Sequence, residues 1–280
     1  MILSGKAKIA GIFGWPIAHS RSPRLHGFWL DRHGIDGAYV PLAVNPESFE
    51  TAFRALPALG FRGVNITVPH KEAALVHCDK VDAQARRIGA VNTVVVDGHG
   101  RLIGSNTDAF GFIESIRRAS DWIAEGGPAV VLGAGGAARA VVVALIDAGV
   151  PEVRVANRTA GRTAAFVEEF GATVTAVDWD ARADALSGAA LLVNTTTLGM
   201  QGHGRLEIDL AQLPTGAVVN DIVYTPLQTP LLKDAAARGN TTVDGLGMLL
   251  YQAQPGFEKW FGVRPEVDAA LRRFVLDDLG

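Results

Sequence analysis

Hydrophobic residues recur along this 280-residue chain with two alternating spacings, one typical of strands and one typical of helices. The first strand-like stretch is KIAGIFG, and it precedes a helix-like stretch, SPRLHGFWLDRHG, with Leu25, Phe28 and Trp29 on one face. Ser22 and Pro23 at its start predict a helix cap followed by a proline in the first turn. Such an alternation predicts an α/β fold with a mostly parallel sheet.

The alternation continues to about residue 106. The stretch PESFETAFRAL places Phe49, Phe53 and Leu56 on one face of a second helix. The stretch AVNTVVVDGHGRLIGS predicts a hairpin that turns at DGHG. These elements together predict a first α/β unit.

From residue 107 the apolar runs become continuous, which is typical of parallel strands covered on both faces by helices. The stretch PAVVLGAGGAARAVVVALIDAG predicts a buried strand, a glycine turn and a helix, and further strand and helix pairs follow it. Towards the end, GLGMLLYQAQPGFEKWFG predicts a long helix that is interrupted near Pro255. The sequence therefore predicts a second unit of the doubly wound, Rossmann type.

A lysine stands out in the stretch GVNITVPHKEAALVH. Val64, Ile66 and Val68 alternate with polar residues, which predicts a strand, and Pro69 suits the first position of a helix. Lys71 then falls in the first helical turn, where the helix dipole disfavours a cation. Only six of the 26 basic residues are lysines, and lysine can release a proton whereas arginine cannot. Lys71 is thus a candidate proton donor; the alternative is a solvated surface lysine.

The glycine turn of the second unit matches a dinucleotide-binding motif. Gly133, Gly135 and Ala138 follow the G-x-G-x-x-G/A pattern between a strand and a helix. Small residues there let a pyrophosphate approach the amides at the helix start, whereas a plain tight turn is the alternative. The predicted cofactor contacts in this turn are Gly133, Ala134, Gly135, Gly136 and Ala137.

The residues at the end of the next strand indicate which dinucleotide binds. Sites for NAD usually carry an acidic residue about 20 residues after the glycines. The segment VANRTAGR has none, and it offers instead Asn157, Arg158, Thr159 and Arg162. An arginine can pair with a 2′-phosphate, so we expect NADP rather than NAD, unless Arg158 is an ordinary surface charge.

Composition excludes several other classes of protein. The net charge of -3 gives no reason to expect a nucleic-acid partner, and the single cysteine, Cys78, excludes an internal disulfide. We expect no signal peptide or membrane span and a cytoplasmic location. His19, His26 and His33 recur every seven residues, a spacing of about 10.5 Å on a helix, which is too long for two ligands of one metal. We therefore expect no metal site.

Polar side chains gather where strands end, and in an α/β sheet such ends converge on the ligand crevice. Hydroxyls and amides with one lysine and one carboxylate suit a small polyhydroxylated acid. Taken singly, each is also a plausible turn or cap residue. The residues are Ser20, Ser22, Asn65, Thr67, Asn92, Thr93, Asn106 and Asp108.

In this order, the motifs resemble those of the shikimate dehydrogenase family, which includes shikimate/quinate dehydrogenases. The matching segments span nearly the whole chain and are AHSRSP, NITVPHKE, GAVNT, NTDAFG, GAGGAAR, NRT and DGLGMLLYQA. The resemblance implies the NADPH-dependent reduction of 3-dehydroshikimate to shikimate, in the chorismate pathway to aromatic amino acids. It also implies a substrate-binding domain of residues 1–106 with 245–280 and an NADP-binding domain of residues 107–244.

The resemblance further implies roles for individual residues. Lys71 and Asp108 would be the catalytic pair, in which Lys71 supplies the proton and the charge for the developing alkoxide. The implied substrate contacts are Ser20, Ser22 and Tyr224 for the carboxylate, and Thr67, Asn92, Gln252 and Asn65 for the ring hydroxyls. Ile222 and Gly245 would touch the nicotinamide end of NADP.

Three other functions stay open at this point. Two have related chemistry, namely a quinate or quinate/shikimate dehydrogenase and an aminoshikimate dehydrogenase. The third, a noncatalytic NADP-binding regulator, would be signalled by loss of the Lys71 and Asp108 pair, and both are present. We expect small-molecule ligands, no nucleic acid, no membrane, and a monomer or homodimer.

Overall fold

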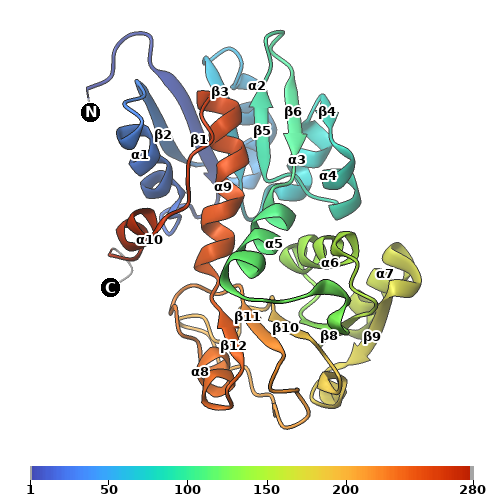
Figure 1. Cartoon of the computed structure of the whole chain (residues 1–280). Helices are drawn as coiled ribbons and strands as arrows, with labels where there is room; N and C mark the ends of the chain where they lie inside the picture. The colour runs from blue at the N-terminus through green and yellow to red at the C-terminus, as the bar shows by residue number, and fades with distance from the viewer. Residues whose placement is uncertain (1, 278–280) are drawn as a thin grey trace. The chain divides into compact units, whose positions relative to one another are not determined.

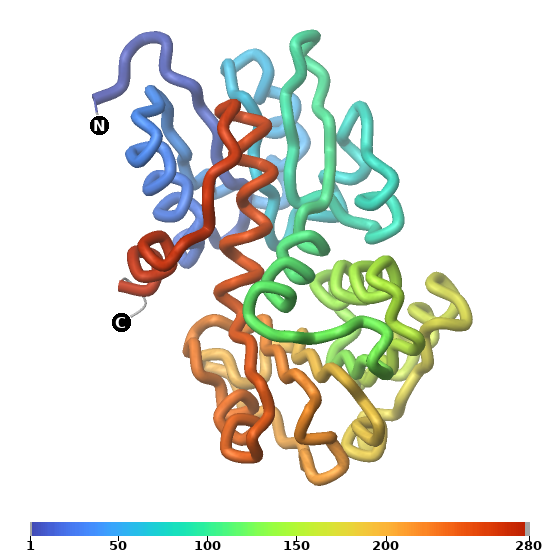
Figure 2. The backbone as a smooth tube through the Cα atoms, in the orientation of Figure 1, coloured from blue at the N-terminus to red at the C-terminus, as the bar shows by residue number. Residues whose placement is uncertain are grey.

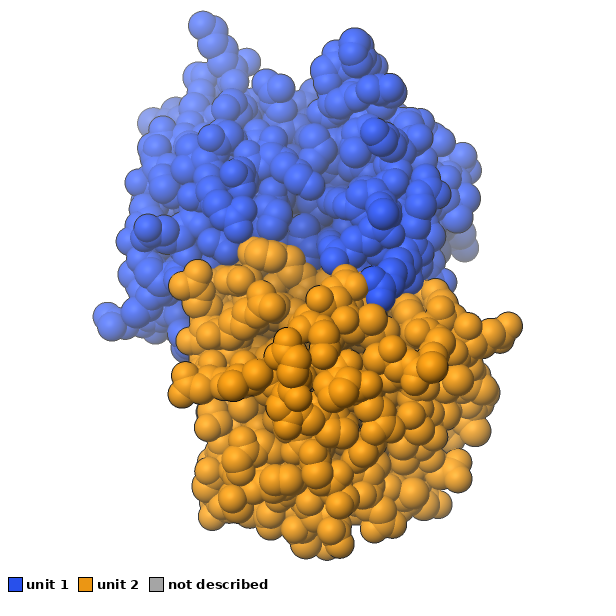
Figure 3. All heavy atoms as spheres, turned by 45° about the vertical axis from the view of Figure 1, so that its right-hand side comes forward, with its two compact units in different colours: residues 1–107, 252–280 blue, residues 108–251 orange. Residues whose placement is uncertain are grey.

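The structure is a computed structural model that describes residues 2–277. The chain divides into two compact units, Met1–Thr107 with Gln252–Gly280 and Asp108–Tyr251 (Figure 3). Each unit contains a six-stranded sheet. The chain passes into the second unit at Asp108 and leaves it within helix α9 (Leu246–Phe261).

The first unit is built on a sheet with the strand order β2-β1-β3-β5-β6-β4 (Figure 1). Its elements from the first part of the chain are β1 (Lys8–Gly14), α1 (Ser22–Arg32), β2 (Gly37–Ala43), a 3-10 turn (Pro46–Ser48), α2 (Phe49–Ala55), β3 (Phe61–Ile66), α3 (Lys71–His77), β4 (Lys80–Val81), α4 (Ala83–Ile88), β5 (Thr93–Val96) and β6 (Leu102–Ser105).

Three of the five strand pairings in this sheet are parallel. The two antiparallel ones join β5 to β3 and to β6, because β5 and β6 form the predicted hairpin. Asp97 Oδ1 accepts hydrogen bonds from the backbone amides of His99 and Arg101 and so stabilises its turn. The predicted hairpin is confirmed.

The predicted apolar helix faces point into the core. Leu25 and Trp29 of α1 are fully buried, and so are Phe53 and Leu56 of the next helical segment, whereas Phe28 is half-buried. Apolar periodicity located these faces because burial of large side chains dominates helix packing.

The expected interruption of the last long helix near Pro255 is wrong, because α9 runs unbroken from Leu246 to Phe261. A proline inside a helix removes one backbone hydrogen bond. Here the residues that follow it, Phe257 and Trp260, are buried at 0% and 3% exposure, and their packing outweighs that loss. The final helix, α10 (Ala269–Leu276), lies beside α1, so the end of the chain packs against its beginning (Figure 2).

The second unit has the strand order β12-β11-β10-β7-β8-β9, and all five pairings are parallel. Its elements are α5 (Asp108–Ala119), β7 (Ala129–Leu132), α6 (Gly136–Ala148), β8 (Val153–Asn157), α7 (Ala160–Phe170), β9 (Val174–Asp178), β10 (Leu191–Asn194), β11 (Val218–Asp221), α8 (Pro230–Ala237) and β12 (Thr241–Val243). This is the predicted doubly wound sheet, and its order reverses between β7 and β10.

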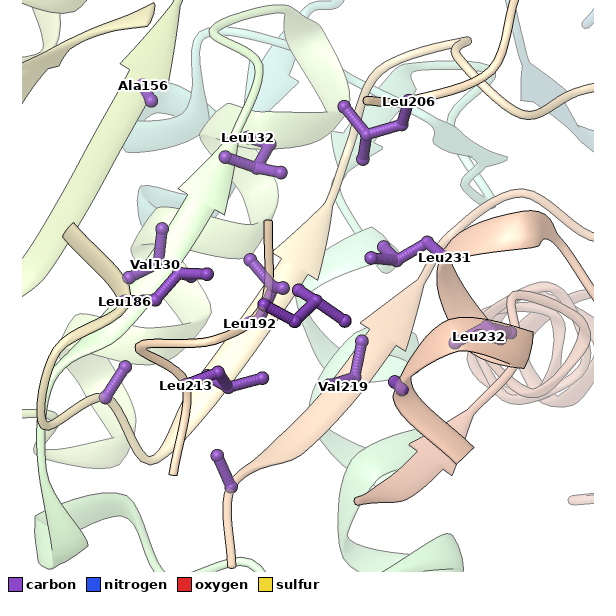
Figure 4. Close-up of a cluster of buried hydrophobic side chains, with 14 residues drawn as sticks. Val130, Leu132, Ala156, Leu186, Leu192, Leu206, Leu213, Val219, Leu231 and Leu232 are labelled. Atoms are coloured by element: carbon purple, nitrogen blue, oxygen red, sulfur yellow. The ribbon is translucent and has the colours of Figure 1, made fainter. Parts of the chain in front are cut away.

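Apolar side chains from neighbouring strands form the core on one face of this sheet (Figure 4). Val130 of β7, Leu192 of β10 and Val219 of β11 are fully buried there, and Leu232 of α8 packs against them. Every residue of β7, β10 and β11 is buried, so their continuous apolar runs are explained by burial on both faces.

The described helices include none with the length and apolar character needed to cross a membrane.

Candidate active site

The polar residues of the first unit gather at one edge of its sheet. The strands β1, β3 and β6 run in the same direction and end at this edge, whereas β5 begins there. The ends of β1, β3 and β6 with the segments that follow them, and the residue that precedes β5, therefore meet at one place. They carry Ser20 and Ser22, Asn65 and Thr67, Asn92, and Asn106 and Thr107.

Asn65 lies at the centre of a buried hydrogen-bond network at this edge. Its Nδ2 donates to the carbonyl oxygen of Asn92 at 3.1 Å and to Oγ1 of Thr93 at 3.1 Å. Its Oδ1 accepts from the hydroxyl of Tyr39 at 2.6 Å. Every polar atom of the Asn65 amide thus has a partner in the protein, and its orientation is fixed.

Asn92 extends the network towards α9. Its Oδ1 accepts from the backbone amide of Thr107 at 2.8 Å and from Oγ1 of Thr93 at 2.9 Å. Its Nδ2 donates to Oγ1 of Thr107 at 3.1 Å and to Oε1 of Gln252 at 3.4 Å. All four residues are at least nine-tenths buried, so they form a rigid polar cluster.

The structure therefore brings together Asn65, Asn92 and Gln252, three of the predicted substrate-binding residues. It adds Tyr39 and Thr107, which the predicted set of site residues lacks, and Thr93, which the sequence places among the polar residues at strand ends but not among the substrate contacts. The dipeptide Asn-Thr occurs at 92–93, 106–107, 194–195 and 240–241, so it does not single out Thr107. Tyr39 offers no signal either, because it is an aromatic residue in an otherwise apolar strand.

Ser20 and Ser22 lie at the start of α1, but the predicted cap is wrong by one position. The helix begins at Ser22 itself, Arg21 is the capping residue, and no side chain caps by hydrogen bonding. Oγ of Ser20 instead accepts from the backbone amide of Ser22 at 3.3 Å. The amide of Ser20 donates to the carbonyl oxygen of Ile17, and this turn places Ser20 next to the start of the helix. The side chain of Ser22 is buried.

Lys71 is the first residue of α3 and is half-buried, so its predicted place in the first helical turn is confirmed. The prediction that the helix begins at Pro69 is wrong. The carbonyl oxygen of Thr67 accepts from the amide of His70 at 2.9 Å, which closes a turn around a cis Val68–Pro69 bond before the helix starts. Thr67 is half-buried at the end of β3, on the same edge as Asn65.

The glycine turn of the second unit lies where the strand order reverses. Gly133 has a φ of 106°, and a Cβ there would lie 2.6 Å from Oγ1 of Thr195, so only glycine fits. Oγ1 of Thr195 donates to the carbonyl oxygen of Leu132 at 2.7 Å, which ties the end of β10 to the end of β7. This is the switch point at which dinucleotides bind in such sheets.

The start of α6 has room for a phosphate group. Gly135 is its capping residue, and no side chain caps the helix. A Cβ added at Gly135 or at Gly136 would meet no atom within 4 Å, and both residues are exposed. No side-chain cap therefore occupies the first-turn amides of this 13-residue helix, and the open space beside Gly135 and Gly136 fits the pyrophosphate of a dinucleotide. Ala134 is buried and Ala137 is half-buried in the same turn.

The predicted 2′-phosphate contacts follow β8. Nδ2 of Asn157 donates to the carbonyl oxygen of Thr159 at 3.1 Å, which shapes the loop around Arg158. Arg158, Thr159 and Arg162 are exposed. An exposed guanidinium after the second strand suits a 2′-phosphate.

Ile222 and Gly245 lie against each other at the ends of β11 and β12. A Cβ at Gly245 would overlap the carbonyl group of Ile222, so this position admits only glycine. Tyr224 is half-buried two residues beyond Ile222.

Asp221, which the predicted site lacks, anchors the loop that carries Ile222. Its carboxylate accepts from Nδ2 of Asn194 at 3.0 Å, from the amide of Val223 at 3.0 Å and from Oγ1 of Thr229 at 2.7 Å. Burial raises the pKa of the Asp221 carboxyl above its ordinary value.

Cys78 packs against the core of the first unit, and burial raises the pKa of its thiol to about 12. The thiol is therefore protonated near neutral pH and a poor nucleophile, as expected for a small core residue. Within residues 2–277 no group of three His, Cys, Asp or Glu residues is arranged to hold a metal ion.

Comparisons with known proteins agree with this arrangement. Residues 12–94 match the shikimate dehydrogenase substrate binding domain, residues 121–199 match the shikimate / quinate 5-dehydrogenase family, and residues 245–273 match the shikimate 5'-dehydrogenase C-terminal domain. Together these matches cover more than half of the chain.

Two relatives are similar over almost their whole length. The shikimate dehydrogenase (NADP(+)) of Paramagnetospirillum magneticum is 63% identical over 275 residues, which is 98% of this chain and 100% of the relative. The enzyme of the same name from Rhodospirillum rubrum is 61% identical over 280 residues, with 98% and 99% of the two chains covered.

Solved structures extend the similarity to the fold. Shikimate 5-dehydrogenase from Thermus thermophilus, in complex with NADP(H) and shikimate, is 40% identical with a TM-score of 0.87, over 96% of this chain and 99% of that one. Quinate dehydrogenase from Corynebacterium glutamicum, in complex with NAD, is 33% identical with a TM-score of 0.89, over 97% and 99%. The family matches and the near full-length identity lead to one conclusion: this chain belongs to the shikimate dehydrogenase family.

Proposed function

We propose that this chain catalyses the reversible, NADPH-dependent reduction of 3-dehydroshikimate to shikimate, a step in aromatic amino-acid biosynthesis. The observation that carries the proposal is the edge of the first unit's sheet, where a buried set of amides and hydroxyls adjoins the segment that is hydrogen-bonded to the backbone carbonyl of Lys71. Such a set suits a small acid with several hydroxyl groups. The relatives that are 61–63% identical bear the name of this activity.

The proposed limits of the two domains rest on where the two proposed sites lie in the chain. Residues 1–106 with 245–280 would bind the substrate, and residues 107–244 would bind NADP. The support is that the polar network lies in the first unit, whereas the glycine turn lies in the second. The compact units change over at Asp108 and within α9, close to these limits.

Lys71 and Asp108 form the proposed catalytic pair. Each is connected by hydrogen bonds, directly or through the neighbouring residue, to the segment just before β5. The carbonyl oxygen of Lys71 accepts from the amide of Val91 at 2.9 Å, next to Asn92. Asn92 in turn accepts from the amide of Thr107, and Asp108 is the next residue along the chain. Both connections lead to residues 91–92, and this supports a role for Lys71 and Asp108 at the same place.

In this proposal the glycine turn from Gly133 to Ala137 would hold NADPH, which would supply the hydride for the carbonyl carbon of the substrate. Lys71 stabilises the negative charge that develops on the carbonyl oxygen and donates a proton to it, which an arginine cannot do. Asp108 orients the ammonium group of Lys71. The proton comes from Nζ of Lys71 and ends on the new hydroxyl group.

The remaining contacts are proposed from their places at the two sheet edges. Ser20, Ser22 and Tyr224 would hold the carboxylate of the substrate, and Asn65, Thr67, Asn92 and Gln252 would surround its ring hydroxyls. The cofactor would contact Gly133, Ala134, Gly135, Gly136 and Ala137 with its pyrophosphate, Asn157, Arg158, Thr159 and Arg162 with its 2′-phosphate, and Ile222 and Gly245 with its nicotinamide.

We also propose that the protein acts in the cytoplasm, as a monomer or homodimer, without nucleic acid. A net charge of -3 and a single cysteine with a raised pKa support this setting. Sedimentation of the purified protein, with and without NADP, distinguishes monomer from dimer.

The activity is tested by following absorbance at the nicotinamide band with shikimate or quinate, each with NADP or NAD. We expect the largest kcat/KM for shikimate with NADP. An equal or larger value for quinate would favour a quinate dehydrogenase, which has a solved neighbour at 33% identity. No turnover with any combination would favour a noncatalytic regulator.

A further inference from the structure

The hydroxyl of Tyr39 holds a residue that the proposed function places on the substrate. It donates to Oδ1 of Asn65 at 2.6 Å. Tyr39 lies on β2 and Asn65 is near the end of β3, so the phenol joins two strands of the first unit.

The direction of the hydrogen bond between Tyr39 and Asn65 follows from the backbone carbonyl group that Asn65 also binds. The carbonyl oxygen of Asn92 can only accept, so Nδ2 of Asn65 must face it and Oδ1 must face Tyr39. The phenol therefore donates to Asn65.

The surroundings hold the phenol in this position. Tyr39 is 7% exposed, and its ring stacks on the imidazole of His26 with 4.0 Å between centroids and 10° between planes. Trp260 covers the tyrosine ring from another side, with 5.9 Å between centroids. Burial raises the pKa of the Tyr39 phenol well above its ordinary value, so it remains a donor at working pH.

We infer that Tyr39 is a positioning residue that orients Asn65 for the substrate, an inference that rests on the proposed function. The bond from Tyr39 leaves Oδ1 of Asn65 with one lone pair, which can accept from a ring hydroxyl of the substrate. Tyr39 acts through Asn65.

The test is Tyr39→Phe in the full chain, because phenylalanine keeps the ring and its stacking and removes only the hydroxyl. We expect KM for shikimate to rise roughly threefold to tenfold, as for the loss of one buried hydrogen bond. KM for NADP should not change, and kcat should change less than KM for shikimate, because the loss affects substrate positioning in the ground and transition states alike.

The matched control is Trp29→Phe in the same aromatic cluster. Trp29 donates from Nε1 to the carbonyl oxygen of Glu266 at 3.0 Å, and Glu266 is not a predicted substrate residue. This variant also loses one buried hydrogen bond, so it should lower Tm without raising KM for shikimate. A rise in KM of the same size in Trp29→Phe would show a general loss of stability and overturn the inference.

A double-mutant cycle with Asn65→Ala tests whether Tyr39 acts through its partner. With Asn65 truncated, Tyr39→Phe should raise KM for shikimate by a clearly smaller factor than in the wild-type chain, because the link to the substrate is already absent. Equal factors in both backgrounds, or an unchanged KM in Tyr39→Phe alone, would overturn the inference. Failure of the proposed function is distinguishable, because the wild-type chain would then not turn over shikimate at all.

Discussion

Gly245 lies against the backbone of Ile222 so closely that any side chain at this position would overlap the Ile222 carbonyl group. A Cβ would also lie 2.7 Å from the carbonyl oxygen of Val223. The contact joins the segment after β12 to the loop after β11, and the resemblance to the shikimate dehydrogenase family implies that both Gly245 and Ile222 meet the nicotinamide end of the cofactor.

Gly245→Ala should therefore impair cofactor binding and stability together. The added methyl group must push the Ile222 backbone away, and such overpacking typically costs about 1–3 kcal/mol. We expect a lower Tm and a higher KM for NADP. Gly27→Ala is the control, because Gly27 is exposed in α1 with no atom near its Cβ position, and alanine should stabilise that helix by about 0.5–1 kcal/mol. Unchanged Tm and KM in Gly245→Ala would contradict the observed contact.

Arg158→Asp should weaken NADP far more than NAD. Loss of a charge-assisted contact costs about 1.5–3 kcal/mol, or roughly tenfold to 150-fold in affinity, and the new carboxylate adds repulsion. KM for NAD in the same variant serves as the internal control, because NAD lacks the 2′-phosphate. If KM for NADP stays the same, the phosphate binds elsewhere, and Arg162→Asp is the next variant to measure.

His26 should make the stability of the protein depend on pH. It is 0% exposed, and burial lowers its pKa from 6.5 to about 3, against a smaller opposing effect of the Asn65 side chain. The unfolded chain therefore binds a proton below pH 6.5 that the folded chain binds only near pH 3. The stability from neutral His26 is fully present above pH 6.5 and is lost as the pH falls towards 3.

Between pH values of about 7.5 and 5.5 this linkage amounts to about 1.4 kcal/mol in the free energy of unfolding. His26→Phe keeps a ring in the stack and removes the titration, so we expect it to lose less stability over this range than the wild-type chain. Urea unfolding at the two pH values measures the difference, and His99→Phe, at an exposed position, controls for replacing a histidine as such. Equal losses in wild type and His26→Phe would show that His26 is charged in the folded state.

Sequence alone predicts the features that depend on neighbours along the chain. The turn at Gly133 follows from a local pattern of small residues between a strand and a helix, and the place of Lys71 follows from the strand before it. The network around Asn65 cannot be predicted in the same way, because its links are long-range. Tyr39 and Asn65 are 26 residues apart, and Asn92 and Gln252 are 160 apart.

The errors have the same origin. Local rules predict that Pro255 interrupts a helix, but tertiary packing of the residues after it keeps α9 continuous. The cap of α1 and the start of α3 are each misplaced, because turns that precede the helices decide where they begin. Local rules thus give the type of an element more reliably than its ends.

Lys71 is the residue on which the proposed mechanism depends. Lys71→Met keeps most of the length and the apolar stem and removes the charge and the proton, so the chain should fold. Acid–base catalysis contributes typically about 10²–10⁴-fold, and we expect kcat to fall within that range while KM for shikimate changes much less.

The most direct measurement is kcat of Lys71→Arg beside that of Lys71→Met and the wild-type chain, with shikimate and NADP at saturation and Tm recorded for each. Arginine retains the positive charge and removes only practical proton exchange. If Lys71 donates the proton, Lys71→Arg recovers little of the lost kcat. A folded Lys71→Met or Lys71→Arg protein with near wild-type kcat would contradict the mechanism and make Lys71 a surface charge.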